Sequence, residues 1–381
     1  MNKLTLLAIT SMGAMLVAQT PSTDAQPAPA AAAAPAAAPA PVVKLRGSIW
    51  ASGEISDKTL ADGTMPFHSM DAANGGFALD GATLGADITL TSGWGIKLTV
   101  LGGNMGKLLN YTDGEAGPGS TMANANQTTL AEAQLIWTGA SDTFKIGRMW
   151  TPLGMEVADQ TANITATRGI LFCNVLPLSQ VGVNWHHAFA PSFSIDLYAI
   201  NGEDKVVDNN QGKTYGLQFT YNHGGAADKF ATLIVFRGPE LSGLGADANK
   251  GAEGQQRERG SFSGQWVWGA STLQWEADYV SNPDLTGVKT KTKGVGLIYK
   301  NQFTDNWAGF ARAETIKSTT LDASLKQTSF VLGAERKWGS TFARFELRHD
   351  SADKGVYNYA DVDGKAFDSA NSATLSFGAS F

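Results

Sequence analysis

The sequence predicts an all-β protein, a transmembrane antiparallel β-barrel of about sixteen strands, with one hairpin more or fewer (14 or 18 strands) left open. Three observations lead to this fold class. Apolar residues recur at every second position for about eight to twelve residues at a time, as in strands with one lipid-facing and one water-facing side. The connections between these segments alternate between short and long. The chain ends on a similar alternating segment whose last residue is Phe381.

The N-terminus has the pattern of an export signal. A short basic start precedes an apolar run, Leu4 to Ala18, which is long enough for a signal-peptide core but too short to span a bilayer. We predict a signal peptide over residues 1–25, with cleavage after Ala18 as the alternative. Residues 26–41 are almost only Ala and Pro and predict a periplasmic linker, with a tether to the cell wall or a partner as the alternative. Residues 42–381 are the predicted barrel.

The first predicted strand shows how the two faces divide. Val43, Leu45 and Ile49 share one face, whereas Lys44 and Arg46 fall on the other. Because side chains alternate across a strand, one face suits lipid and the other suits water. The same division recurs in the later segments up to Phe381.

A segment near the C-terminus decides which face points inward. Arg344, Glu346 and Arg348 alternate with apolar residues, so three charges share one face of a short strand. A charge on the lipid face costs roughly 2 to 4 kcal/mol near the midplane, and three would consume most of a typical stability of about 5 to 15 kcal/mol. The charged faces must therefore point into the lumen. The predicted pore-lining residues are Lys44, Arg46, Glu54, Lys97, Glu132, Asp196, Glu276, Asp278, Arg312, Glu314, Arg344, Glu346 and Arg348.

Turn signals sort the connections into two classes. Short ones hold a few turn residues, such as Ser92 with Gly93, and long ones are rich in Gly, Asp and Asn. The predicted long loops are residues 57–76, 102–126, 150–179, 201–213, 238–260, 281–291, 315–327 and 351–371. Outer-membrane barrels have short periplasmic turns and long external loops, so both ends of the barrel are predicted to be periplasmic. The strand number stays open by one hairpin because residues 143–149 and 230–237 alternate poorly.

One long loop differs from the others in composition. Residues 150–179 form the longest predicted connection and carry apolar residues such as Ile164 and Leu171, which a wholly solvated loop would not need. In a wide barrel such a loop can fold inward and narrow the pore. The predicted constriction residues are Glu156, Asp159 and Arg168. An external cap or a subunit contact is the alternative.

The sequence gives no support to catalysis, to a cofactor or to a metal site. Neither a Gly-x-Ser-x-Gly elbow nor a His-Glu-x-x-His motif occurs, and His186 and His187, adjacent on a predicted strand, face opposite sides. Residues 361–368 resemble only part of a calcium loop. The single cysteine, Cys173, cannot form an internal disulfide, and a net charge of −6 does not favour nucleic-acid binding. We expect a protein that is not an enzyme.

Several motifs resemble those of a known family, the OmpL-like putative outer-membrane β-barrel porins. The most specific stretch is residues 145–156, KIGRMWTPLGME, which is similar to the family's strand that ends in an aromatic-Thr-Pro-x-Gly-x-Glu turn. Further similar segments are residues 181–185, 199–202, 312–314 and 344–350. The resemblance covers about residues 45–381 and implies a general or weakly selective channel. The layout is more distantly similar to phosphate-selective porins, but acids interrupt the ladder of inward basic residues that is their signature.

These observations together predict a porin of the bacterial outer membrane, through whose polar lumen small hydrophilic solutes or ions diffuse passively. A non-conducting barrel that acts as an adhesin, a receptor or a structural protein is the alternative. A sixteen-stranded barrel leaves an aqueous lumen unless something fills it, which favours the channel. The expected partners are outer-membrane lipid and the barrel-assembly machinery, through the last strand ending at Phe381. We include a homotrimer among the assemblies expected of such a barrel.

Overall fold

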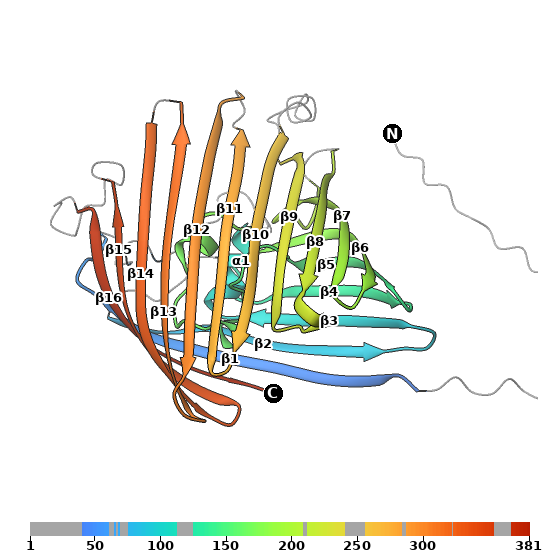
Figure 1. The fold of residues 1–381 in the computed structure, drawn as a ribbon, viewed down its shortest axis with the longest axis horizontal. Coiled ribbons are helices and arrows are strands. Elements are labelled where there is room, and N and C mark those ends of the chain that lie inside the picture. Colours follow the sequence, from blue (N-terminus) through green and yellow to red (C-terminus); the bar gives the residue numbers. More distant parts are fainter. Residues whose placement is uncertain are drawn as a thin grey trace, which may run out of the picture. The chain divides into compact units, whose positions relative to one another are not determined.

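Sixteen antiparallel strands close into one barrel in the computed structural model of the chain, each strand paired with its neighbours in sequence order (Figure 1). The predicted fold class and strand number are therefore confirmed. The structure describes residues 40–60, 65, 68, 75–112, 125–208, 212–240, 256–283, 287–321, 323–353 and 367–381. The predicted signal peptide, nearly all of the predicted linker and most of the calcium-like segment lie outside the described residues.

The strands take up most of the described chain. They are β1 (Val42–Ser56), β2 (Gly76–Thr89), β3 (Trp94–Gly102), β4 (Thr129–Thr138), β5 (Asp142–Trp150), β6 (Ser179–Ala190), β7 (Phe193–Glu203), β8 (Thr214–Asn222), β9 (Lys229–Pro239), β10 (Gln256–Trp268), β11 (Ser271–Pro283), β12 (Lys289–Gln302), β13 (Trp307–Thr320), β14 (Ala323–Trp338), β15 (Thr341–Ala352) and β16 (Ser369–Ser380). The poorly alternating residues 143–149 and 230–237 are strand as well. In the described part of the chain, no helix is long and apolar enough to cross a membrane.

Side chains alternate along the strands between the lumen and the outer surface. In β15, Arg344 and Glu346 are buried, whereas their neighbours Phe345 and Leu347 are about half exposed. The two apolar side chains face the lipid, and the two charged side chains face the lumen, as expected for a strand of a membrane barrel. Because the inward charges are buried, something inside the barrel covers them.

Aromatic side chains gather on the outer surface at the end of the barrel that carries the short turns. Ring contacts run from Trp137 of β4 through Phe144 of β5 and Trp185 of β6 to Phe193 of β7 and Phe219 of β8. Such a girdle marks the boundary between hydrocarbon and headgroups. With short turns on the periplasmic side, the girdle is the inner rim of the membrane-spanning band, and the opposite end of the barrel is external.

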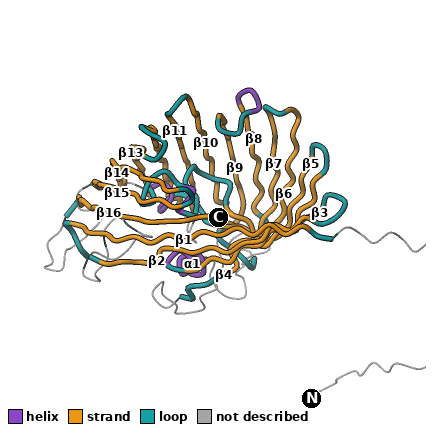
Figure 2. The backbone as a smooth tube through the Cα atoms, turned by 90° about the horizontal axis from the view of Figure 1, so that it is seen from below, coloured by secondary structure: helices purple, strands orange, loops and turns teal. Residues whose placement is uncertain are grey.

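The first and last strands pair and close the barrel (Figure 2). The pairing ends at Gly47 and Phe381, which exchange two backbone hydrogen bonds of 3.1 and 2.9 Å. The Phe381 ring lies over Gly47, and an added Cβ at this position would come within 2.6 Å of that ring unless the ring moved. The C-terminal residue is therefore part of the seam.

Two of the predicted long loops are much shorter in the structure, and a third is a long connection that contains a helix. β13 runs to Thr320 and β14 starts at Ala323, so a tight hairpin replaces the predicted loop 315–327. The predicted loop 281–291 shrinks in the same way, between the ends of β11 and β12. Lys, Thr and Ser at these strand ends are typical of loops, but a strand that projects beyond the apolar band can be polar on its outer face too. The predicted loop 102–126 contains a helix, α1 (Asn104–Thr112).

Helix α1 packs into the barrel and contributes to its internal core. Met105 and Leu109 are buried against Trp50 of β1 and Leu101 of β3. Leu178, from the connection between β5 and β6, belongs to the same cluster. The barrel therefore contains an apolar core to which two connections contribute side chains. The alternating pattern of the strands alone does not indicate this core.

Candidate functional site

Residues 150–179 connect β5 to β6 and fold into the barrel; we call them the inward segment. They contain η2 (Gln160–Ala162) and α2 (Ile170–Asn174). Apolar residues of the inward segment form four clusters with inward-facing residues of the wall. The clusters join Phe172 and Leu178 to Trp50 and Leu101 of β1 and β3, Leu153 to Ile200 and Phe236 of β7 and β9, Leu171 to Val280 and Ile316 of β11 and β13, and Ile164 to Phe310 and Val331 of β13 and β14. Because these strands are spread around the ring, the inward segment crosses the lumen.

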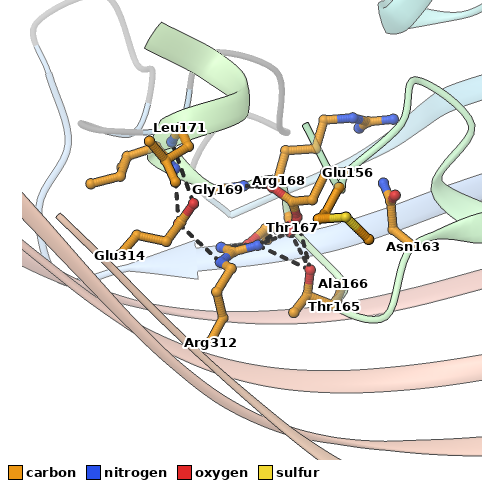
Figure 3. Close-up of polar contacts among 12 residues, drawn as sticks. Glu156, Asn163, Thr165, Ala166, Thr167, Arg168, Gly169, Leu171, Arg312 and Glu314 are labelled. Atoms are coloured by element: carbon orange, nitrogen blue, oxygen red, sulfur yellow. Dashed lines mark hydrogen bonds and ion pairs between the residues drawn. The ribbon is translucent and has the colours of Figure 1, made fainter. Parts of the chain in front are cut away.

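Two charged residues of β13 hold the middle of the inward segment (Figure 3). Arg312 Nη1 lies 2.9 Å from Glu156 Oε1 and donates to the Thr167 carbonyl oxygen at 2.6 Å. The carboxylate of Glu314 accepts a hydrogen bond from the backbone N–H of Ile170 at 3.0 Å. Hydrogen bonds to charged groups are stronger than neutral ones, so this pair binds both a side chain and the backbone of the segment.

Three charged residues of β15 hold the part of the inward segment before α2. Arg344 donates to the Gln160 carbonyl oxygen at 2.9 Å, and Glu346 accepts from the backbone N–H of Ala166 at 2.7 Å. Arg348 donates to a further carbonyl oxygen of the segment at 2.8 Å. The polar groups of a buried connection need partners. The charged wall supplies these partners, and the segment in turn covers the charges.

A second group of charges holds the end of the inward segment. Arg259 of β10 donates to the Val175 carbonyl oxygen, and its Nε lies 2.6 Å from Oε1 of Glu203 on β7. Asp204, directly after β7, accepts from the backbone N–H of Leu178 at 2.6 Å. Burial raises the pKa of Asp204, partly against those backbone hydrogen bonds. The segment is thus anchored near its C-terminal end as well as in its middle.

Glu240, which follows β9, lies beside this second group. It accepts a hydrogen bond from the backbone N–H of Glu203 at 2.8 Å and another from the Thr214 hydroxyl. Burial, together with the charge of Glu203, raises the pKa of Glu240 to about 7. Glu240 therefore changes charge near neutral pH.

A cavity of about 210 Å³ lies between part of the inward segment and the wall formed by β1 to β4, beside the places where the segment contacts that wall through Phe172, Leu178 and Asp159. Arg46 and Lys97 reach it from the wall, and both pair with Glu132, at 3.2 and 2.9 Å. The other side of the cavity is formed by the segment, including Trp150 and Asp159. Arg46 and Lys97 are half-buried, so these cations face open space and are not covered by the segment.

The remaining residues predicted to line the pore lie on other parts of the wall. Glu276 accepts from the backbone N–H of Met155 at 2.8 Å, and Asp278 is buried two residues along the same strand. Asp196 pairs with His186 at 3.1 Å. Glu54 is buried with its carboxylate 3.6 Å from the His68 ring, and Lys44 is exposed at the start of β1. Of these residues, Glu276 holds the inward segment as the charges of β13 and β15 do, through its contact with Met155.

The predicted constriction residues have different roles in the geometry. Glu156 contacts Arg312 and accepts from the backbone N–H of Gly169 at 2.7 Å. Asp159 accepts from the Ser48 hydroxyl at 2.6 Å and caps η2. Arg168 donates to a carbonyl oxygen within the segment and lies over the Phe172 ring. All three stabilise the fold of the segment, and Glu156 and Asp159 also border the cavity.

Sequence reasoning missed the small residues through which the inward segment meets the wall. The Thr167 hydroxyl bonds to Glu346, and the Thr165 hydroxyl accepts from Arg312 at 3.0 Å. An added Cβ at Gly169 would lie 2.1 Å from Glu314 Oε1. The signal in the sequence was the run of small and polar residues from 165 to 169 within an otherwise apolar connection.

Comparisons with known proteins agree on one fold. A family model described as putative beta-barrel porin-2, OmpL-like, matches residues 42–381. A loop L8 deletion mutant of OmpT, an outer membrane protein of Vibrio cholerae, is similar at 13% identity and a TM-score of 0.59, over 90% of this chain and 100% of that one. The outer membrane channel DcaP of Acinetobacter baumannii is similar at 14% identity and a TM-score of 0.57, over 90% and 97%.

Two further comparisons complete the picture. The trimer form of in-vitro folded OmpT from Vibrio cholerae has a TM-score of 0.57 at 13% identity, over 90% of this chain and 100% of that one. No curated protein matches the sequence significantly. The likeness to solved structures at such identities concerns the fold, and the family model carries the assignment.

Proposed function

Since the chain belongs to the OmpL-like family of putative β-barrel porins, we propose that solutes cross it between the inward segment and the β1 to β4 wall. The protein is a porin of the bacterial outer membrane, as the family and the barrel indicate. Small hydrophilic solutes and ions are the substrates that a polar lumen admits. The inward segment, residues 150–179, is the proposed constriction.

The observation that supports this path is that the inward segment covers the charges of one wall and leaves a cavity beside the other. On β13 and β15 the inward charges bond directly to the segment, which leaves them in contact with protein. Beside β1 to β4 the segment leaves a cavity, with Arg46 and Lys97 at its edge. A hydrated solute needs space and partly solvated polar groups, and the second wall provides both.

Site-directed blocking tests this path. In a Cys173→Ser background, Thr83→Cys introduces a thiol at the cavity, and Ser329→Cys introduces a matched one on β14 where the side chain is buried. A charged methanethiosulfonate should lower single-channel conductance of the Thr83 variant and leave the Ser329 variant unchanged. Blocking through Ser329 alone would place the path on the opposite wall.

Deletion of residues 164–176 tests the constriction itself. The deletion removes most contacts between the segment and β13 to β15. Single-channel conductance in a planar bilayer should rise. Unchanged conductance in a variant that still shows heat-modifiable migration would mean that the segment does not limit the flow.

We also propose a homotrimer, supported by the trimer form of the similar OmpT structure. Cross-linking of the protein in native outer membranes should yield a species of three chains. The barrel-assembly machinery is the proposed second partner, through the strand that ends at Phe381. Deletion of Phe381 should sharply lower the folded yield in the outer membrane, and a normal yield would contradict this role.

A further inference from the structure

Five lysines share the outward face of β12 to β14 at the external end of the barrel. They are Lys289, Lys291 and Lys293 on β12, Lys317 on β13 and Lys326 on β14, and all are exposed. We call them the lysine patch. Their partners on the opposite face, such as Thr292 and Ser318, bond to one another across the strands. The lysine side chains therefore point away from the lumen.

The strand register sets three of these lysines side by side. Lys293 lies directly opposite Lys317, and Lys317 lies directly opposite Lys326. Directly opposed residues of antiparallel strands have Cβ atoms about 5 Å apart, and like charges in this arrangement repel each other. Such a row is unfavourable unless an anion lies over it.

The acidic residues in the part of the chain that the structure describes do not supply that anion. On the outward face of the external half of β10 to β15, the described acids are Glu258, which pairs with Arg237 at 3.7 Å, and Asp353, which accepts from the backbone N–H of Lys326 at 2.9 Å. None of the five lysines forms an ion pair with a described residue. The sequence also holds Asp284 and Asp322 in connections outside the described residues.

The patch lies at the border of the lipid-facing surface. Two and four residues along the same face of β12, Val295 and Leu297 are each 53% exposed, and Phe330 and Leu332 continue this apolar surface on β14. The lysines follow directly on its external side. Lysine stems lie along apolar surface while the ammonium groups reach toward water, so the charges sit where the headgroups of the outer leaflet begin.

From this placement we propose that the lysine patch binds phosphate groups of anionic lipid headgroups in the outer leaflet. The patch extends about 10 Å across three strands and about 13 Å along β12, room for a headgroup with two phosphates. A phosphate oxygen set between Lys293, Lys317 and Lys326 would turn their mutual repulsion into shared attraction. The site binds lipid from outside the barrel and takes no part in the solute path.

A charge-neutralised variant tests the site against a matched control. The patch variant is Lys293→Gln, Lys317→Gln and Lys326→Gln; the control is Lys58→Gln, Lys205→Gln and Lys213→Gln, which removes the same charge at scattered positions on the external side. The full-length barrel in neutral detergent is titrated with bisphosphorylated lipid A and with its dephosphorylated form. At about fivefold per lysine, the patch variant should bind the phosphorylated lipid about 100-fold more weakly.

Two further measurements keep the result unambiguous. Without anionic lipid the patch variant should unfold at the same or a higher temperature than the native protein, whereas with phosphorylated lipid A the native protein should be the more stable. Inorganic pyrophosphate at the same phosphate concentration should not give this stabilisation, because it lacks the acyl chains. Equal losses in patch and control variants, equal binding of the dephosphorylated lipid, or full competition by pyrophosphate would each overturn the proposal.

Discussion

The walls formed by β1 to β4 and by β13 to β15 carry the same kinds of charged pair but use them differently. On β13, the side chain of Arg312 is 0% exposed and bonded to the inward segment. On β1 and β3, Arg46 and Lys97 pair with Glu132 but remain 28% and 36% exposed beside a cavity. One wall therefore anchors the segment, and the other faces the space that it leaves.

The difference teaches that an inward charge is not by itself a pore-lining charge. A connection folded into a barrel brings backbone N–H and C=O groups that need partners. Arg344 and Glu346 supply these partners at fixed positions along β15. In the solute path proposed above, Arg344 and Glu346 lie outside the conducting space because the segment covers them.

The largest expected effect comes from a change in the wall that anchors the segment, β13 to β15. Arg312→Met removes the buried cation between Glu156 and Glu314 and leaves two acids without it. Removing one partner of a buried ion pair costs about 3–5 kcal/mol. The temperature at which the folded band is lost in a gel should fall clearly, and single-channel noise should rise as the segment loosens.

Arg46→Met is the matched change on the other wall. Lys97 stays beside the buried carboxylate of Glu132, so that carboxylate keeps a cationic partner when Arg46 is removed. The unfolding temperature should change little. If both variants lost the same stability, the distinction between an anchoring and an open wall would be wrong.

A smaller effect concerns ion preference. Lys97→Gln removes a cation at the edge of the cavity, so the reversal potential in a salt gradient should shift toward cation preference. The shift should shrink as rising ionic strength shortens the Debye length below about 10 Å. Arg348→Gln, which acts on a covered charge, should give the weaker shift. The opposite ranking would place the conducting path along β15.

The smallest expected effect depends on pH at the second anchor. The pKa of Glu240 is raised to about 7 in the folded protein, so the folded state holds this proton more tightly than the unfolded chain does. Stability from this group is present at low pH and is lost as pH rises from about 4.5 toward 7. Glu240→Gln should flatten this fall. The unfolding temperatures of both proteins at pH 5 and pH 8 measure it, and parallel curves would exclude Glu240 as the cause.

The wall of the barrel was predictable because its signal is local. Arg344, Glu346 and Arg348 differ from their apolar neighbours at every second position, and the lipid enforces that difference residue by residue. The apolar content of residues 150–179 predicted that this connection folds inward, but which of its residues cover these charges was not predictable in the same way. The contacts between Glu346 and Ala166, or Arg312 and Thr167, join distant parts of the chain and leave no period in the sequence.

The predictions for the external ends of the strands were wrong for a different reason. Lys289 to Lys293 alternates Lys with Thr, which is a strand period, but both residue types are also common in loops. Sequence reasoning weighed composition above period and assigned a loop where β12 begins. Helix α1 was missed because its apolar residues pack against Trp50, on a strand distant along the chain, as well as against Leu101 of the neighbouring β3.

The seam between Gly47 and Phe381 has a consequence for how the chain folds. The first and last strands are partners, so the contact that completes the hydrogen-bonded ring is also the one with the longest separation along the chain. Contacts of this kind form slowly, because loop-closure entropy is lost before they are made. Until β16 has paired with β1, both strands present unpaired edges, which favour wrong partners. A chain that lacked β16 would keep all its other strands and still expose unpaired edges on β1 and β15 for as long as it exists.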